Sequence, residues 1–271
     1  KRDADDDNNS SSVAATVVMI TKNEEVGVAA SLERLRRFRQ IVVVDSGSTD
    51  RTVEICKSYG AEVIDFVWDG EYPKKKQWAL ENAPIRENVV LLLDADEYPS
   101  ECLDSQIDEY IERLLDGTFD AYDVELVYIF AGRELRHGHR VAKRSLFRTG
   151  AVSFPEIGDL DAPGIREVEG HYQPTVDGRV GRIRDALIHH DHDPVASWFD
   201  RHNRYSDWEA HLRYHGVLKS AVADHRSRNG RLFDRIPMKP VVFFLYSYVL
   251  RAGFMDGRAG WYFHVLQGFW Y

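Results

Sequence analysis

Short apolar runs alternate with amphipathic stretches along the first hundred residues. The apolar runs cover residues 13–20 (VAATVVMI), 41–44 (IVVV), 62–66 and 89–93 (VVLLL), and helical patterns cover 24–37, 51–59 and 74–82. Apolar runs of this length are typical of strands buried on both faces. A repeated strand and helix alternation predicts a parallel sheet covered by helices.

Polar clusters close three of these runs, at residues 21–24, 45–50 and 94–97. The carboxyl ends of parallel strands meet at one rim of a sheet, and ligands bind beyond that rim. Thr21, Lys22 and Asn23 also offer capping side chains ahead of the first helix. The pattern therefore predicts a ligand site where the three clusters converge.

The pattern becomes less regular after residue 97. An amphipathic helix to about residue 115 precedes strands at 122–130, 145–148 and 180–188, and the chain reads as helical from 195 onward. We expect an α/β catalytic domain over 13–193, with a nucleotide half (13–98) and an acceptor half (99–193). A C-terminal helical region would follow over 194–271.

The net charge adds little to the predicted fold. The net charge of the 271 residues is −9. Residues 1–12 are rich in Asp, Asn and Ser without apolar periodicity, so we expect a disordered tail there, with a net charge of −2 that leaves −7 for the folded part. An acidic body argues against nucleic acid as a partner.

Cysteine usage and hydropathy predict a cytoplasmic protein. Two cysteines form no disulfide framework, no signal-peptide pattern opens the chain, and no apolar stretch reaches the ~20 residues that cross a bilayer. Residues 238–271 are rich in aromatic and apolar side chains. Basic residues lie just before this stretch and within it: Arg231, Arg235, Lys239, Arg251 and Arg258. This region suits a peripheral layer resting on lipid at the inner face of the membrane or, as an alternative, packing on the sheet or on a second subunit of a homo-oligomer.

Asp94 and Asp96 follow directly on the last apolar run of the nucleotide half. Two carboxylates at a strand end suit a hard cation such as Mg²⁺ or Mn²⁺, which keeps positions open for phosphate oxygens. Such a cation can hold a diphosphate and neutralise the charge that develops as it leaves. The alternative is a solvated turn, since Asp-rich strand ends are common.

Asp45 closes its strand in the same way, ahead of Gly47 and Ser48, which permit a tight turn close to a ligand. Its carboxylate is placed to accept from a base N–H or a ribose hydroxyl. Asp50 fits better as a helix cap than as a ligand contact.

Four motifs together resemble a known family. TKNEE at 21–25, VVVDSGSTDRT at 42–52, KKKQWAL at 74–80 and LLLDADEY at 91–98 are similar to the nucleotide-binding half of the inverting family 2 glycosyltransferases. RHNRYSDWEA at 201–210 and YVLRAGFMDGRAG at 248–260 resemble the branch of bacterial lipopolysaccharide-core and lipooligosaccharide glucosyltransferases. The resemblance implies a GT-A fold, a Rossmann-like and mostly parallel nucleotide-binding sheet.

The resemblance also implies roles for residues. Asp45 would contact the base, Asp96 the metal, and Asp94 the ribose or the metal. His189, which ends a predicted strand, would approach the metal or the diphosphate, unless it belongs to a polar surface turn. The nucleotide contacts it implies are Thr21, Asn23, Glu24, Asp45, Lys76, Gln77, Asp94 and Ala95. For the lysines at 74–76 the alternative is a solvated basic face.

An inverting transfer needs a carboxylate that takes the proton of the acceptor hydroxyl. The resembling branch has a His-Glu pair here, whereas this chain has EVEGH. We place Glu169 first, with Glu156 and Asp191 behind it. Each of these acids is equally suited to capping a strand or pairing with Arg166 or Arg182.

The combined reading is a metal-dependent, inverting hexosyltransferase. It would move a sugar from a nucleotide-sugar, UDP-sugar first and GDP-sugar second, to a saccharide or lipid-linked glycan. One rival is a sugar nucleotidyltransferase, but TKNEEVG lacks the glycine- and arginine-rich loop that holds a triphosphate. The other is a non-catalytic module that binds nucleotide-sugar or glycan.

Overall fold

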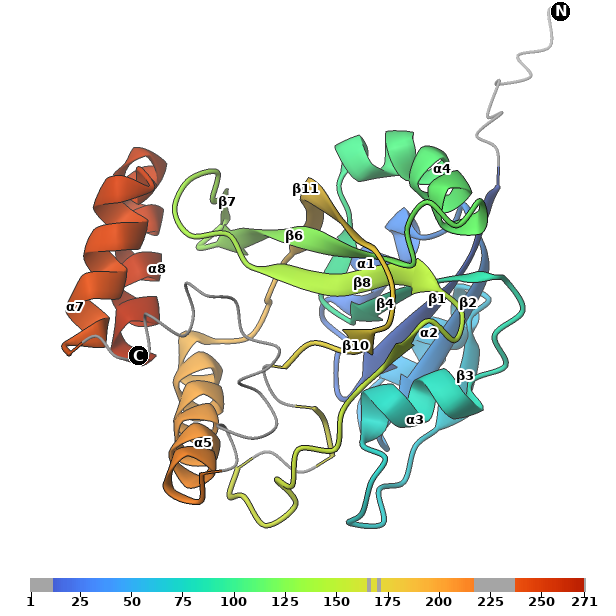
Figure 1. The fold of residues 1–271 in the computed structure, drawn as a ribbon, viewed down its shortest axis with the longest axis horizontal. Coiled ribbons are helices and arrows are strands. Elements are labelled where there is room, and N and C mark those ends of the chain that lie inside the picture. Colours follow the sequence, from blue (N-terminus) through green and yellow to red (C-terminus); the bar gives the residue numbers. More distant parts are fainter. Residues whose placement is uncertain (1–11, 165–166, 170–171, 217–236, 271) are drawn as a thin grey trace, which may run out of the picture.

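The computed structural model describes residues 12–164, 167–169, 172–216 and 237–270. A mixed sheet with the strand order β3-β2-β1-β4-β8-β6-β11-β5 runs through the molecule, and β7 pairs with β6 (Figure 1). Its strands are β1 (Val13–Thr21), β2 (Phe38–Asp45), β3 (Glu62–Asp65), β4 (Val89–Asp94), β5 (Glu97–Pro99), β6 (Ala121–Phe130), β7 (Arg133–Glu134), β8 (Ala142–Arg148) and β11 (Val180–His189). A separate small sheet pairs β9 (Val152–Ser153) with β10 (Thr175–Val176).

The helices lie on both faces of the sheet and at one end of the molecule (Figure 1). They are α1 (Val28–Arg34), α2 (Thr52–Ser58), α3 (Lys75–Asn82), α4 (Glu101–Leu115), α5 (Val195–Tyr214), α7 (Lys239–Phe244) and α8 (Gly257–Trp270). A π-helical turn, η2 (Leu245–Leu250), and a 3₁₀ turn, η3 (Gly253–Asp256), join α7 to α8. The α/β class with a C-terminal helical region is confirmed.

The predicted parallel half is also confirmed. Strands β3, β2, β1 and β4 all run parallel, and Val17 of β1 is in register with Ile41 on one side and Leu91 on the other. Successive side chains of a strand point to opposite faces. Val17 and Leu91 accordingly join the core under α1, α2 and α4, while Val18 joins the second core under α3.

The sheet curls beyond β4 and brings distant strands to the rim. Strand β8 pairs antiparallel with both β4 and β6, and β11 runs parallel to β6. Strand β5, only two residues after β4, pairs with the end of β11 and sets His189 opposite Glu97. The turn that carries Asp96 therefore lies beside the last residue of β11.

The first helix is shorter than the predicted 24–37 and uses no cap from residues 21–23. Its N-cap is Gly27, without a side-chain hydrogen bond. The backbone N–H groups of Asn23 and Glu25 donate instead to Ser48 and Asp50 in the loop that follows β2, and that of Glu24 donates to Thr52, the first residue of α2. Because those donors have partners outside the helix, this segment forms a turn.

The C-terminal helices dock on strand β6. The Phe263 ring lies 5.3 Å from Tyr128 and 5.6 Å from Phe130, so part of the aromatic surface packs on the sheet as one expectation had it. In the part of the chain that the structure describes, no helix is both long and apolar enough to cross a bilayer. The expected tail lies outside the described residues, except for Ser12.

Candidate active site

Asp94 at the end of β4 lies between two lysines. Its Oδ2 is 2.5 Å from Lys143 Nζ, and its Oδ1 is 3.2 Å from Lys76 Nζ. Burial alone would raise the pKa of Asp94, but the two ammonium groups hold it far below its usual range. Because 35% of the side-chain surface of Asp94 is exposed, the two lysine charges outweigh burial in setting its pKa. Asp94 is therefore ionised and is paired with two lysines of the protein itself.

Glu97 shares Lys143 with Asp94. Both oxygens of its fully buried carboxylate accept from Lys143 Nζ, at 2.7 and 2.6 Å, and Oε2 also accepts from the Asp94 backbone N–H at 3.1 Å. Burial would lower the pKa of Lys143, yet the two carboxylates raise it above its usual range. Sequence reasoning missed Lys143, because nothing in the local pattern of β8 marks it.

Asp96, in the turn between β4 and β5, faces His189 at the end of β11. His189 Nε2 lies 3.5 Å from Asp96 Oδ2, and Nδ1 lies 3.6 Å from Glu97 Oε1. Burial lowers the pKa of His189, but the two carboxylates outweigh it and raise the value to about 9. Burial, with the charges of Glu97 and Asp94, raises the pKa of Asp96, although His189 opposes this. His189, expected near the metal or the diphosphate, thus lies beside Asp96, the residue expected to bind the metal.

These groups fit a cation that is shared with a bound diphosphate. Nowhere in the described residues do three His, Cys, Asp or Glu side chains gather closely enough to hold a metal alone. Mg²⁺ and Mn²⁺ commonly take only one or two protein ligands and complete their shell with water and phosphate oxygens. Asp96 and His189 are placed to supply those ligands, whereas the lysines occupy both oxygens of Asp94.

A second group of acids adjoins Asp96. Burial, followed by the charges of Asp96, Asp193 and Asp191, raises the pKa of Glu24 to about 8, and Arg201 of α5 partly offsets them. Arg201 forms ion pairs with both Asp191 and Asp193. Glu24, expected at the site, therefore lies within electrostatic reach of Asp96 and Asp191, and the backbone N–H of His190, next to Asp191, donates to the Asp96 carbonyl at 2.9 Å.

Tyr205, one helical turn after Arg201, is also affected by the charge of Asp96. Burial raises its pKa, and the negative charges of Asp94 and Asp96 add to the effect. Helix α5 therefore brings Tyr205 within electrostatic reach of Asp94 and Asp96, and Arg201 within reach of Glu24. Sequence reasoning had used this segment only for its resemblance to a family branch.

Asp45 is buried at the predicted rim position. Its Oδ1 accepts from the hydroxyls of Thr21 (2.8 Å) and Ser48 (2.5 Å), and its Oδ2 accepts from the Ser48 backbone N–H at 2.7 Å. Asn23, with a φ of 57°, accepts from the Thr49 N–H through its side-chain oxygen at 2.8 Å. These bonds tie the loops after β1 and β2 into one rim. Asp50 accepts from the Thr52 N–H at 3.0 Å, but the N-cap of α2 is Arg51, so Asp50 lies one residue before the cap position.

Helix α3 is fixed to this rim by its first residues. Lys75 Nζ is buried and donates to the Thr21 carbonyl at 2.6 Å. Burial lowers the pKa of Lys75 to about 8, although Glu167 and Asp45 oppose the shift. The expectation of a solvated basic face is wrong for Lys74 and Lys75, which are fully buried, while Lys76 reaches Asp94.

Four predicted residues are placed away from Asp96 or are otherwise engaged. Glu169 accepts from the backbone N–H groups of Lys76 and Gln77, both at 2.8 Å, and so caps α3. Glu156 is exposed. Ala95 is buried, and its carbonyl accepts from the Ser31 hydroxyl at 2.7 Å.

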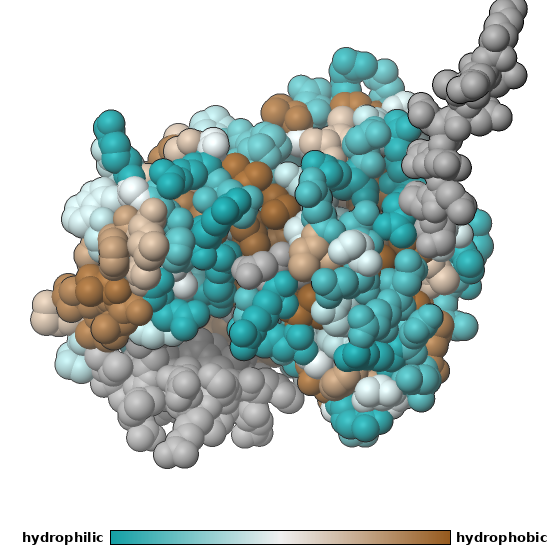
Figure 2. Space-filling model, turned by 90° about the horizontal axis from the view of Figure 1, so that it is seen from above, coloured by the Kyte–Doolittle hydropathy of each residue, from teal (hydrophilic) through white to brown (hydrophobic). Residues whose placement is uncertain are grey.

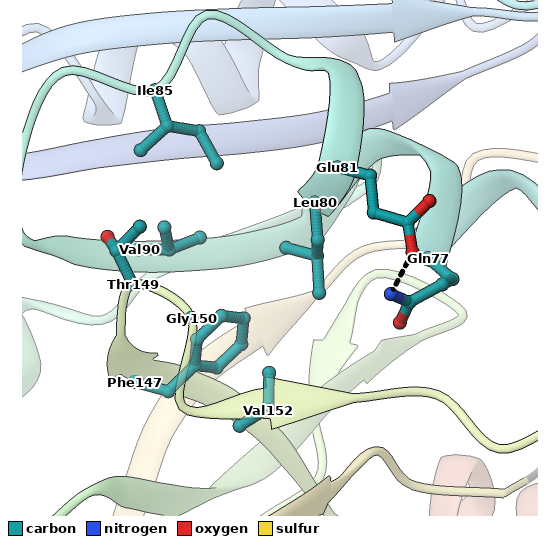
Figure 3. A pocket seen from close by; sticks show the side chains of 9 residues that line it. All are labelled: Gln77, Leu80, Glu81, Ile85, Val90, Phe147, Thr149, Gly150 and Val152. Atoms are coloured by element: carbon teal, nitrogen blue, oxygen red, sulfur yellow. Dashed lines mark hydrogen bonds between the residues drawn. The ribbon is translucent and has the colours of Figure 1, made fainter.

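Gln77, the fourth, lines a pocket on the far side of α3 (Figure 3). Its amide donates to Glu81 at 2.7 Å, and its oxygen accepts from the Phe154 N–H at 2.7 Å. The rest of the pocket wall is mainly apolar, with Leu80, Ile85, Val90, Phe147 and Val152. This pocket contains none of the charged groups around Asp96, so it is separate from the candidate active site.

Sequence relatives cover parts of the chain. An uncharacterized glycosyltransferase of Rickettsia typhi is 35% identical over 42% of this chain, and the lipopolysaccharide core biosynthesis glycosyltransferase LpsC of Rhizobium meliloti is 37% identical over 36%. A dolichyl-phosphate hexose transferase of Haloferax volcanii is 31% identical over 52%. The matches span 38%, 35% and 57% of these three relatives, less than two thirds of their length.

Solved structures share the arrangement only loosely. The crystal structure of S. aureus TarS 1–349 has a TM-score of 0.45 at 14% identity, and covers 95% of this chain and 89% of its own. Glucosyl-3-phosphoglycerate synthase from Mycobacterium tuberculosis has a TM-score of 0.33 at 21% identity, with 42% of this chain and 44% of its own covered. The family model described as "Glycosyl transferase family 2" matches residues 16–164, which include the loops of Asp45, Asp94 and Asp96. Because that match spans more than half of the chain, the protein belongs to glycosyl transferase family 2.

Proposed function

We propose that this family 2 glycosyltransferase transfers a hexose from a nucleoside diphosphate sugar to a saccharide or lipid-linked glycan, with inversion at the anomeric carbon. The observation that carries the proposal is the opposition of Asp96 and His189, 3.5 Å apart, beside the buried Asp45 loop. UDP-sugar is the first donor, as the family resemblance suggests, and GDP-sugar the second. Relatives named for dolichyl-phosphate and for lipopolysaccharide core support such an acceptor.

The binding part of the proposal uses the rim. Asp45 and Thr21 would line the base and ribose pocket with Asn23 and Glu24, and Asp96 and His189 would hold Mg²⁺ or Mn²⁺. The cation would neutralise charge on the departing diphosphate. Lys76 and Lys143 keep Asp94 ionised, so Asp94 would orient a ribose hydroxyl in place of binding metal.

The chemical step needs a base. Of the three candidates, Asp191 directly follows His190, whose backbone N–H donates to the Asp96 carbonyl at 2.9 Å. We place it as the base, with Arg201 as the group that orients its carboxylate. The acceptor oxygen would bond to the anomeric carbon as the bond from that carbon to the diphosphate oxygen breaks, and the hydroxyl proton would pass to Asp191.

Thermal unfolding with UDP, GDP, CDP and ADP, each with and without Mn²⁺, tests the binding part. A ligand at 100 times its dissociation constant stabilises the native state by about 2.7 kcal/mol, or roughly 5 to 10 °C for a chain of this size. We expect that shift with one nucleotide and Mn²⁺, and its loss in Asp96→Asn. The matched control is Glu112→Gln, on the exposed side of α4. No shift with any nucleotide would refute a nucleotide site at this rim.

Transfer of label from a UDP-sugar to extracted membrane glycolipids tests the chemical part. We expect Asp191→Asn to lose about 10²- to 10⁴-fold in rate with nucleotide binding unchanged. Nucleotide binding without turnover in the unaltered chain would favour the non-catalytic module. Transfer that persists in Asp191→Asn would return the role of base to Glu169 or Glu156.

A further inference from the structure

Exposed apolar side chains concentrate in the C-terminal hairpin, formed by α7, η2, η3 and α8. Of the 17 large hydrophobic residues exposed in the described part of the chain, 11 fall between residues 238 and 269. They are Met238, Val241, Leu245, Tyr246, Val249, Leu250, Phe254, Met255, Trp261, Tyr262 and Phe269. The remaining six are spread over the rest of the fold, so the hairpin carries a patch that chance exposure does not explain.

The patch lies at the end of the molecule that the hairpin forms. The left edge of Figure 2, where α7 and α8 lie in Figure 1, shows a dense brown area beside hydrophilic residues. Val241, Leu245 and Val249 follow one another at four-residue intervals, so they form one stripe. Leu250 and Phe254, 77% and 52% exposed, extend it over the turn between the helices.

The opposite face of the hairpin is already used for docking. Phe263 packs on the sheet, and buried Asp256 accepts from the backbone N–H groups of Arg136 (3.2 Å) and His137 (2.9 Å). Within the hairpin, the Trp261 ring packs 5.3 Å from Tyr248. The hairpin is therefore fixed on its inner side, while its outer apolar side chains remain between 41% and 77% exposed among the described residues.

The charged residues of the hairpin indicate which kind of partner its outer face suits. The described residues 237–270 contain Lys239, Arg251 and Arg258 against one acid, Asp256, in a chain whose net charge is −9. Asp256 is buried and accepts from the backbone N–H groups of Arg136 and His137, while Arg251 and Arg258 are exposed at the turn. Apolar side chains mixed with arginines are typical of segments that lie in the interface of an anionic bilayer.

We propose that the C-terminal hairpin docks this protein on an anionic membrane surface, with Leu250 and Phe254 entering the acyl boundary and Arg251 and Arg258 meeting lipid phosphates. A second copy is a poorer occupant, because a two-fold contact through this face would bring the same arginines together. The aromatic chain from Phe263 through Tyr128 to His189, with ring separations of 5.3 and 5.1 Å, connects the inner side of the hairpin to the candidate active site. If the proposed function holds, this arrangement suits an acceptor carried by a lipid.

Co-sedimentation of the full chain with vesicles tests the docking without any need for activity. We expect sedimentation with vesicles of phosphatidylcholine and phosphatidylglycerol, weakening as salt is raised, and little with phosphatidylcholine alone. Leu250→Asp with Phe254→Asp should lower the bound fraction roughly tenfold. Val67→Asp, at a residue 87% exposed in a distant loop, is the matched control and should bind as the unaltered chain does.

Two results would overturn the proposal. One is a chain that stays in the supernatant with every vesicle, whether or not it binds nucleotide. The other is a double-aspartate variant that sediments as well as the unaltered chain while its melting curve shows it folded. A dimer in sedimentation equilibrium that the double variant abolishes, without vesicle binding, would assign the hairpin to self-association instead.

Discussion

Lys74 and Asp159 form an ion pair, with Nζ 2.7 Å from Oδ2, in which neither side chain reaches solvent. The same carboxylate accepts from Trp208 Nε1 at 2.9 Å and from the Tyr72 hydroxyl at 2.5 Å. It thereby joins the segment before α3 to helix α5. Trp208 lies on the face of α5 that also carries Arg201 and Tyr205, so this pair sets the position of two groups of the candidate active site.

Breaking this pair from one side should be more harmful than removing both partners. Lys74→Met or Asp159→Asn alone leaves a buried charge without its counterion, and we expect each to cost about 3–5 kcal/mol of unfolding free energy. The double variant should cost less than the sum of the two, which urea unfolding would measure as a coupling energy. Glu54→Gln, in the exposed pair with Arg51, is the control and should not move the midpoint. Additive losses would show that the pair does not act as a unit.

Lys143→Met should reverse the pH dependence of stability around the site. In the unaltered chain Lys143 holds the pKa values of Asp94 and Glu97 low, so their contribution is present above about pH 4 and is lost as pH falls. Without the ammonium group the two carboxylates repel each other, their folded pKa values rise, and stability should fall as pH rises from about 4 to 7. Lys143→Arg should keep the original direction. Parallel stability curves for Lys143→Met and the unaltered chain would contradict the assignment.

Glu24→Gln should stabilise the chain in alkaline buffer. Because the pKa of Glu24 is raised to about 8, the folded state binds more protons than the unfolded chain between about pH 4.5 and 8, and stability declines across that window. Glutamine removes the titration, so the melting temperature of the variant should exceed that of the unaltered chain at pH 8 and differ less at pH 5. Glu112→Gln, exposed on α4, should show neither effect. An equal difference at both pH values would rule out titration of Glu24 as the cause.

Glu169→Ala separates a structural role from a catalytic one. Its carboxylate satisfies two backbone donors of α3, and loss of a helix cap costs about 0.5–2 kcal/mol. We expect that loss of stability together with weaker nucleotide binding, since Lys76 lies in the same turn. An unchanged unfolding curve with abolished transfer would instead make Glu169 the base, as the sequence had suggested.

The order of elements is determined by the sequence alone. The runs at 13–20, 41–44 and 89–93 lie within β1, β2 and β4, because burial on both faces requires continuous apolar residues. The rim position of Asp45, Asp94 and Asp96 follows from the same logic, since each acid closes or follows a parallel strand. These signals are local, so a linear pattern suffices to find them.

Only the tertiary structure decided which groups meet at the rim. Lys143 and Asp94 are 49 positions apart in the sequence, and they meet because β8 pairs with β4. No periodicity in the sequence predicts that contact. The same limit hid the capping role of Glu169 and the position of Gln77 in a separate pocket, which depend on which face of α3 meets the rest of the fold. A charged side chain acquires its role from the partners that folding brings within reach, since Coulomb and hydrogen-bond energies depend on distance in space.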